Sequence, residues 1–135
     1  MHPLHHAQSS AKKHGGDPSD YQYIHDWFDE TKQYFGDARH RALRHHTAGI
    51  FWCEEAFGVC MTNREGKIIP VRVIAEQHVM EDMGFLPTPD WWLSQMMLVP
   101  AMNKVPTKPG ESQKGISPVE ELRRTLAHEL YKGEG

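Results

Sequence analysis

Two segments of the chain pair a histidine with a carboxylate four residues later: His25 with Asp29 in "IHDWFDE", and His78 with Asp82 in "EQHVMED". Side chains four residues apart lie on the same face of a helix, so each pair could present an imidazole and a carboxylate to one ion. Helical bundles build metal sites from side chains on facing helices, and mixed nitrogen and oxygen ligands suit zinc, manganese or iron. Together with a further inward-facing histidine, the predicted ligands of a divalent metal are His25, Asp29, His46, His78 and Asp82.

The densest group of nitrogen side chains is the string "RHRALRHHTAG", which holds three histidines and three arginines. His40, His45 and His46 are not three or four residues apart, so they do not form a metal motif on one helix. Arg41 and Arg44 are three residues apart and His45 adjoins them, which predicts a local cationic strip. Such a strip could hold a phosphate by bidentate hydrogen bonds. The alternative is a solvated helix face whose arginines pair with nearby acidic residues.

The length, charge and cysteine content limit the classes of function that the protein can have. The 135 residues are enough for one domain with a core, and the net charge of −3 makes nucleic acid an unlikely partner. Cys53 and Cys60 form no CxxC pair, which argues against a cysteine zinc site. With neither a signal-like apolar run nor a membrane-length one, we expect a protein of the bacterial cytoplasm with no membrane partner. Catalytic residues are unknown, because no complete catalytic motif appears.

The positions of caps and the apolar periodicity predict a mainly α fold, a small helical bundle with one short β-hairpin insertion. Five helices are expected before the chain's last third: at residues 3–14, from Asp17 to Phe35, from Asp37 to Phe57, at about 71–83, and from Thr88 onward. The hairpin is expected at about 59–71, where "VCMT" and "KIIPV" flank "NREG" and Gly66 supplies a positive φ.

The predicted domain organisation has three parts. Residues 1–100 form the helical domain with its hairpin. Residues 101–116 are rich in proline, glycine and lysine and are predicted to be a flexible linker. Residues 117–135 are predicted to be a C-terminal helix and tail, because Ser117 and Glu120 match a capping box.

Several uncommon strings occur in one order, among them "HPLHHAQSSAKKHGG", "IHDWFDETK", "RHRALRHH", "TNREGKIIPVR" and "EQHVMEDMGFLPTPDWW". In these strings the chain resembles a family of small histidine-rich bacterial and phage proteins known only as a domain of unknown function. The resemblance covers about residues 2–95. It implies a phage or prophage accessory protein and carries over no activity, cofactor or catalytic residue.

Two hypotheses from different classes remain open. In the first, the protein is a metal-binding helical protein with hydrolase activity on a phosphate-containing substrate. In the second, it is a non-catalytic protein that binds and modulates a host protein, and its histidines serve as hydrogen-bonded core residues. A histidine on a partly apolar helix face is more often such a core residue than a ligand.

Overall fold

The computed structural model of the chain describes residues 2–103, which belong to two units. The compact unit Met1–Met97 contains nearly all the described elements, and the second unit contributes the 3-10 helix Pro100–Asn103. The predicted linker at residues 101–116 therefore begins within this 3-10 helix, and its remainder lies outside the described residues. The predicted C-terminal helix at residues 117–135 also lies outside them.

Three elements of the first unit lie where the sequence predicted them. Helix α1 spans Pro3–His14, helix α5 spans Val71–Met83, and a two-stranded antiparallel hairpin joins β1 (Cys60–Thr62) to β2 (Ile68–Pro70). The turn of the hairpin contains Gly66 with φ 82°, a conformation that glycine adopts without steric cost. The small mainly α fold with one short hairpin is thus confirmed.

The second predicted helix is interrupted, which corrects the expectation of one helix from Asp17 to Phe35. Helix α2 covers only Gln22–Asp29, and 3-10 helices precede it at Pro18–Asp20 and follow it at Glu30–Tyr34. Such tightened turns are common at the ends of α-helices. As a result, Asp29 is the last residue of α2 and carries its carboxylate into the core.

The third predicted helix is also divided, and this break decides where the neighbouring histidines point. After a 3-10 turn, α3 spans Arg41–Arg44, and α4 begins afresh and spans Thr47–Phe57. Between them, His46 is extended and caps α4 by accepting a hydrogen bond at Nδ1 from the amide of Gly49, at 3.0 Å. A Cβ at Gly49 would overlap the carbonyl oxygen of Arg44, so the close approach of these two turns requires glycine.

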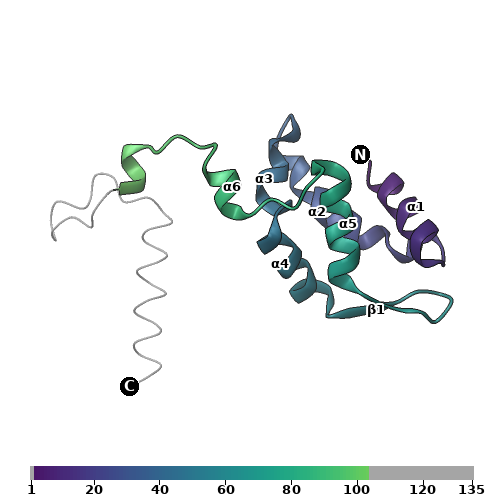
Figure 1. Cartoon of the computed structure of the whole chain (residues 1–135). Helices are drawn as coiled ribbons and strands as arrows, with labels where there is room; N and C mark the ends of the chain where they lie inside the picture. The colour runs from purple at the N-terminus through teal and green to yellow at the C-terminus, as the bar shows by residue number, and fades with distance from the viewer. Residues whose placement is uncertain (1, 104–135) are drawn as a thin grey trace, which may run out of the picture. The chain divides into compact units, whose positions relative to one another are not determined.

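Helix α5 lies at the centre of the domain, where it contacts α1, α2 and α4 (Figure 1). The short helix α6, Pro89–Leu93, is tied to the junction of α3 and α4, because Trp92 donates its indole N–H to the carbonyl oxygen of His45 at 2.9 Å. None of the helices among residues 2–103 is both long and apolar enough to cross a bilayer. The buried apolar core consists of Tyr21, Ile24, Phe28, Ile50, Cys53, Met61, Ile69, Val71, Ile74, Ala75 and Val79.

Candidate metal centre

Six histidine and aspartate side chains meet between α1, α2, α5 and the segment that leads into α4. We call them the His/Asp cluster. Each of the six side chains is at most 7% exposed, so their charges and ring nitrogens are satisfied by one another or by a bound ion. The cluster consists of His6, Asp29, His40, His45, His78 and Asp82.

Asp82 is central to one half of the cluster. Its Oδ1 lies 3.1 Å from Nε2 of His6, and its Oδ2 lies 2.9 Å from Nε2 of His45 and 3.2 Å from Nε2 of His78. Burial raises the pKa of Asp82, but its contacts with His45, His6 and His78 outweigh burial and hold the pKa far below its usual range. The carboxylate is therefore ionised at neutral pH, although its side chain is nearly inaccessible to solvent.

Asp29 joins the two halves of the cluster. Its Oδ1 lies 3.4 Å from Nε2 of His40 and 3.6 Å from Nε2 of both His45 and His78, while its Oδ2 is buried without a hydrogen-bond partner. Burial raises the pKa of Asp29, but contacts with His78 and His45 lower it further than burial raises it. Two ionised carboxylates thus face the same group of imidazoles.

A chain of hydrogen bonds shows which nitrogen of His78 carries hydrogen. The hydroxyl of Ser10 donates to Oε1 of Gln77 at 2.9 Å, so its oxygen accepts from Nε2 of His25, at 2.8 Å. Burial, followed by the neighbouring imidazoles, lowers the pKa of His25 to about 3, so this ring is neutral and its Nδ1 has no hydrogen. At 2.9 Å, that nitrogen accepts from Nδ1 of His78.

The second nitrogen of His78 is the decisive atom. With the hydrogen at Nδ1, neutral His78 presents the lone pair of Nε2 to the oxygens of Asp82 and Asp29. Nε2 makes no hydrogen bond despite its short distance to Asp82, because an N–H there would not point at the oxygen. Burial lowers the pKa of His78, but the two carboxylates outweigh burial and raise it. A positive charge between this ring and the two carboxylates, supplied by either a proton or a metal ion, would therefore stabilise the cluster.

His6 has the arrangement that metal-ligating histidines usually show, with one ring nitrogen bonded to a carboxylate outside the centre. Its Nδ1 lies 2.9 Å from Oε1 of Glu81, and its Nε2 faces Asp82. Burial raises the pKa of Glu81, but hydrogen bonds from Gln77, Ser9 and His6 together lower it to about 2. Glu81 is therefore an ionised acceptor that holds hydrogen on Nδ1 of His6, and Nε2 is the nitrogen that could bind an ion in place of its hydrogen bond with Asp82.

These side chains could hold a metal ion. The ligand atoms of His6, Asp29, His78 and Asp82 all lie within 4.8 Å of one another, and a second set comprises Asp29, His40 and His45. A four-coordinate zinc ion sits about 2.0–2.2 Å from histidine nitrogen and carboxylate oxygen, so small side-chain shifts would bring the first set around one ion. A third grouping, of His6, His25 and His78, meets the same distance limit but contains no carboxylate to balance the charge of an ion.

A family model matches residues 1–102, a range that contains the whole His/Asp cluster. The chain belongs to the DUF6915 family, a domain of unknown function. This match confirms the expected resemblance to a family without an assigned activity. No curated protein and no solved structure matches the chain.

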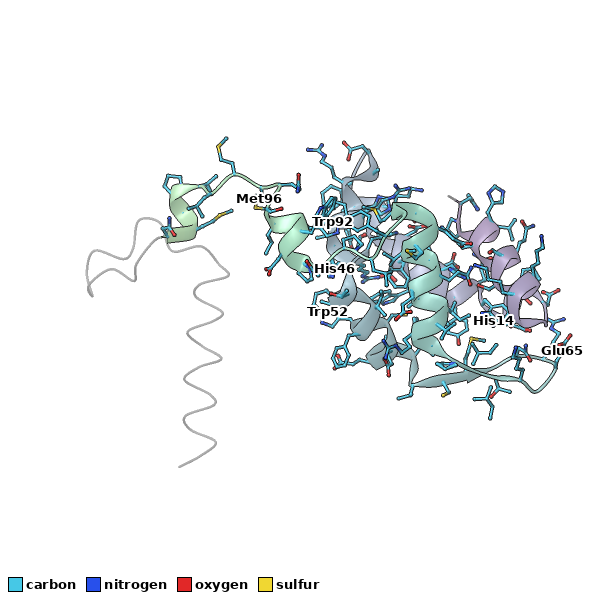
Figure 2. The ribbon with its side chains drawn as sticks, in the orientation of Figure 1. His14, His46, Trp52, Glu65, Trp92 and Met96 are labelled. Atoms are coloured by element: carbon cyan, nitrogen blue, oxygen red, sulfur yellow. The ribbon has the colours of Figure 1, made fainter. Side chains whose placement is uncertain are left out.

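In this DUF6915 domain, three of the five predicted metal ligands lie in the cluster: Asp29, His78 and Asp82. His25 lies beside it and bonds to His78. His46 does not join it, because its two ring nitrogens bond to the backbone at Leu43 and Gly49. Figure 2 shows His46 next to Trp52, on the side of α4 near α6.

The three residues predicted to bind phosphate do not form one surface strip. Arg44 stacks on Trp27, with its guanidinium carbon 4.2 Å from the ring centroid, and donates to the carbonyl oxygen of Trp27 at 2.6 Å. His45 is fully buried in the cluster. Arg41 turns toward Asp82, with its Nη2 3.7 Å from Oδ1, and is 28% exposed. The break between α3 and α4 separates these side chains, since one continuous helix would have kept them adjacent.

His6 and His40 are cluster members that the sequence analysis did not select. His6 stood out only through its neighbours in "HPLHH", and its partner Asp82 is 76 residues away in the chain. His40 has no carboxylate at helical spacing within its own helix, and it meets Asp29 only because the 3-10 helices turn the chain back on itself. No local pattern in the sequence marks either contact.

Proposed function

We propose that this DUF6915 domain is a metal-binding protein whose ion is held by His6, Asp29, His78 and Asp82. The observation that carries the proposal is Nε2 of His78, which lies 3.2 Å and 3.6 Å from two ionised carboxylates while its hydrogen is committed to the opposite side of the ring. The mixed nitrogen and oxygen ligands suit zinc, manganese or iron.

Charge supports a metal ion over a network of neutral histidines. If the imidazoles are neutral, the carboxylates of Asp29 and Asp82 are buried together, and among the described residues Arg41 pairs with Asp82 at 3.7 Å. Buried charges of like sign repel one another, and removing the partner of a buried charge typically costs about 3–5 kcal/mol. A divalent ion between Asp29 and Asp82 would neutralise both.

We extend the proposal to hydrolysis of a phosphate-containing substrate. The side chain of Arg41 is 28% exposed and reaches from the cluster toward solvent, so the exposed part of its guanidinium could donate to a phosphate oxygen. A bound ion would lower the pKa of a water molecule and polarise the phosphoryl oxygen. The water oxygen would then attack phosphorus, the ester P–O bond would break, and the leaving oxygen would take up a proton. On the basis of the family resemblance, we further propose that the protein acts as a phage or prophage accessory protein in the cytoplasm of a bacterial host.

The alternative is a protein that binds a host protein and has no catalytic role. It is favoured by exposed apolar side chains on and after α6 and on the neighbouring turn of α4: Leu93, Met96, Met97, Phe51 and Trp52. Exposed apolar groups of this kind often mark a protein interface. In this hypothesis the cluster is held together by protonated histidines and no metal is needed.

The test begins with elemental analysis of protein purified without a histidine tag, because the chain already has ten histidines. We expect a stoichiometric transition metal that a chelator removes. The metal-loaded protein is then assayed with a chromogenic phosphate ester. Arg41→Gln should reduce turnover while retaining the metal, and Arg39→Gln, which changes an arginine 82% exposed and paired to Asp37, should not. Protein that contains no metal and gains none on incubation with zinc, manganese or iron would overturn the metal proposal. Bound metal without hydrolysis would remove only the catalytic part.

A further inference from the structure

The proposed ion does not use His40 or His45, yet both of these histidines also face the carboxylate of Asp29. His40 has one ring nitrogen 3.3 Å from the carbonyl oxygen of Asp37 and the other 3.4 Å from Oδ1 of Asp29. A carbonyl oxygen only accepts, so Nδ1 of His40 carries the hydrogen. Unlike Nε2 of His78, Nε2 of His40 is hydrogen-bonded to a carboxylate oxygen, and a bound ion would take the place of this hydrogen bond.

His45 completes this second set. Its Nε2 lies 3.6 Å from Oδ1 of Asp29 and 2.9 Å from Oδ2 of Asp82, and its Nδ1 is buried without a partner. Its position is held from the other side by α6, because Trp92 donates to its carbonyl oxygen. The break between α3 and α4 therefore places Nε2 of His45 between the two carboxylates.

Asp29 is shared by both sets. The first comprises His6, Asp29, His78 and Asp82, and the second comprises Asp29, His40 and His45. Oδ1 of Asp29 faces His40 and His45 of the second set and also His78 of the first, while Oδ2 is buried without a hydrogen-bond partner. A carboxylate oxygen that faces imidazoles of both sets is placed to bridge paired ions.

We propose that the centre binds two divalent ions, the second held by His40, His45 and Asp29, with Asp29 bridging the pair. This inference rests on the proposed function, since it assumes that the first set is occupied. The first set supplies four protein ligands, so an ion there would bind water in a fifth position. The second set has three, which leaves a coordination position for water or a substrate oxygen, as in catalytic zinc sites. Paired ions about 3.5–4 Å apart are the usual arrangement for displacement at phosphorus.

Charge and location agree with an anionic substrate at the second ion. Two divalent ions bring more positive charge than the carboxylates of Asp29, Asp82 and Glu81 balance, and Arg41 adds to the excess. The second set also lies beneath the surface turn that carries residues 32–39, all of which are exposed. A phosphate oxygen would complete the coordination of the second ion and offset the excess charge.

The experiment measures how many ions each variant binds. Metal-free protein is titrated with zinc by calorimetry, and the saturated samples are analysed for metal content. We expect two ions per wild-type chain, one for His40→Gln, and two for the matched control His46→Gln, which alters a buried histidine outside the cluster. Wild-type protein loaded with manganese should also show the electron paramagnetic resonance signal of a coupled pair, which does not depend on any variant folding.

The outcomes separate the two proposals. A wild-type chain that saturates at one ion and gives the signal of isolated manganese would overturn the second site and leave the first intact. Retention of two ions by His40→Gln would also overturn the assignment of the second site. A chain that binds no ion would overturn both proposals.

Discussion

Replacing His78 with glutamine distinguishes two roles for this residue: a metal ligand, or a buried histidine that makes only hydrogen bonds and packing contacts. His78 is fully buried, donates from Nδ1 to His25, and stacks on Phe28 with a centroid distance of 4.8 Å. In chelator, His78→Gln should lose the hydrogen bond, about 1 kcal/mol, and the ring contact, about 0.5–1.5 kcal/mol. The free energy of unfolding should therefore fall by about 1–3 kcal/mol from these losses alone.

A bound ion adds a second effect that only the wild type should show. A ligand at one hundred times its dissociation constant stabilises the folded state by about 2.7 kcal/mol. For a unit the size of Met1–Met97, each kcal/mol shifts the melting temperature by about 4–8 °C, so saturating metal should raise the wild-type value by about 11–22 °C. His78→Gln should show little of this rise, because it removes a ligand of the first ion.

His46→Gln is the matched control, because His46 is also buried but caps α4 instead of joining the cluster. Loss of the cap should cost about 0.5–2 kcal/mol, with or without metal. Thermal unfolding of the three proteins is followed by circular dichroism, first in chelator and then with zinc. If His78→Gln gained as much stability from zinc as wild type and His46→Gln, His78 would not be a ligand. If none of the three responded to zinc, the metal proposal would fail.

Two further predictions concern residues outside the cluster. Burial raises the pKa of the Cys53 thiol to about 12, whereas Cys60 is exposed, so at pH 8 a thiol reagent should modify one cysteine in the native protein and both in denaturant. Cys60→Ser should leave no reactive thiol in the native state, and rapid modification of two native thiols would show that Cys53 is accessible. Arg44→Gln should lower the free energy of unfolding by about 1–3 kcal/mol in urea titrations, because it loses a cation–π contact and a hydrogen bond to a carbonyl oxygen. Its turnover of a phosphate ester should match that of wild type, and a selective loss of turnover with unchanged stability would instead make Arg44 a substrate ligand.

The elements predicted correctly are those with strong local signals. Helix α1 begins with Pro3 and ends before a pair of glycines, and the hairpin has Gly66 in its turn. Helix α5 has an inward stripe at helical spacing, and Val71, Ile74, Ala75, His78 and Val79 along it are all fully buried. These signals act within a few residues, so the sequence displays them directly.

The break between α3 and α4 had no comparable signal. Histidine is not among the preferred residues at a helix N-cap, so the sequence "RHHTAG" predicts the interior of a helix and no helix start. In the structure, His46 takes the cap, Gly49 admits the carbonyl oxygen of Arg44, and Trp92 holds the carbonyl oxygen of His45. The last two of these conditions depend on how the turns pack together, which helix propensity does not describe.

The sequence by itself determined the helical character of the described domain, the hairpin, and the pair His78–Asp82, because spacing along one helix decides which side chains share a face. Only the tertiary structure decided which histidines among residues 2–103 meet the carboxylates of Asp29 and Asp82. It brought in His6 from 76 residues before Asp82 and His40 from a 3-10 turn, and it kept His46 out. The reason is physical: a buried carboxylate must be compensated by whatever group the packed helices place within about 3–4 Å, and that distance depends on helix packing more than on separation along the chain.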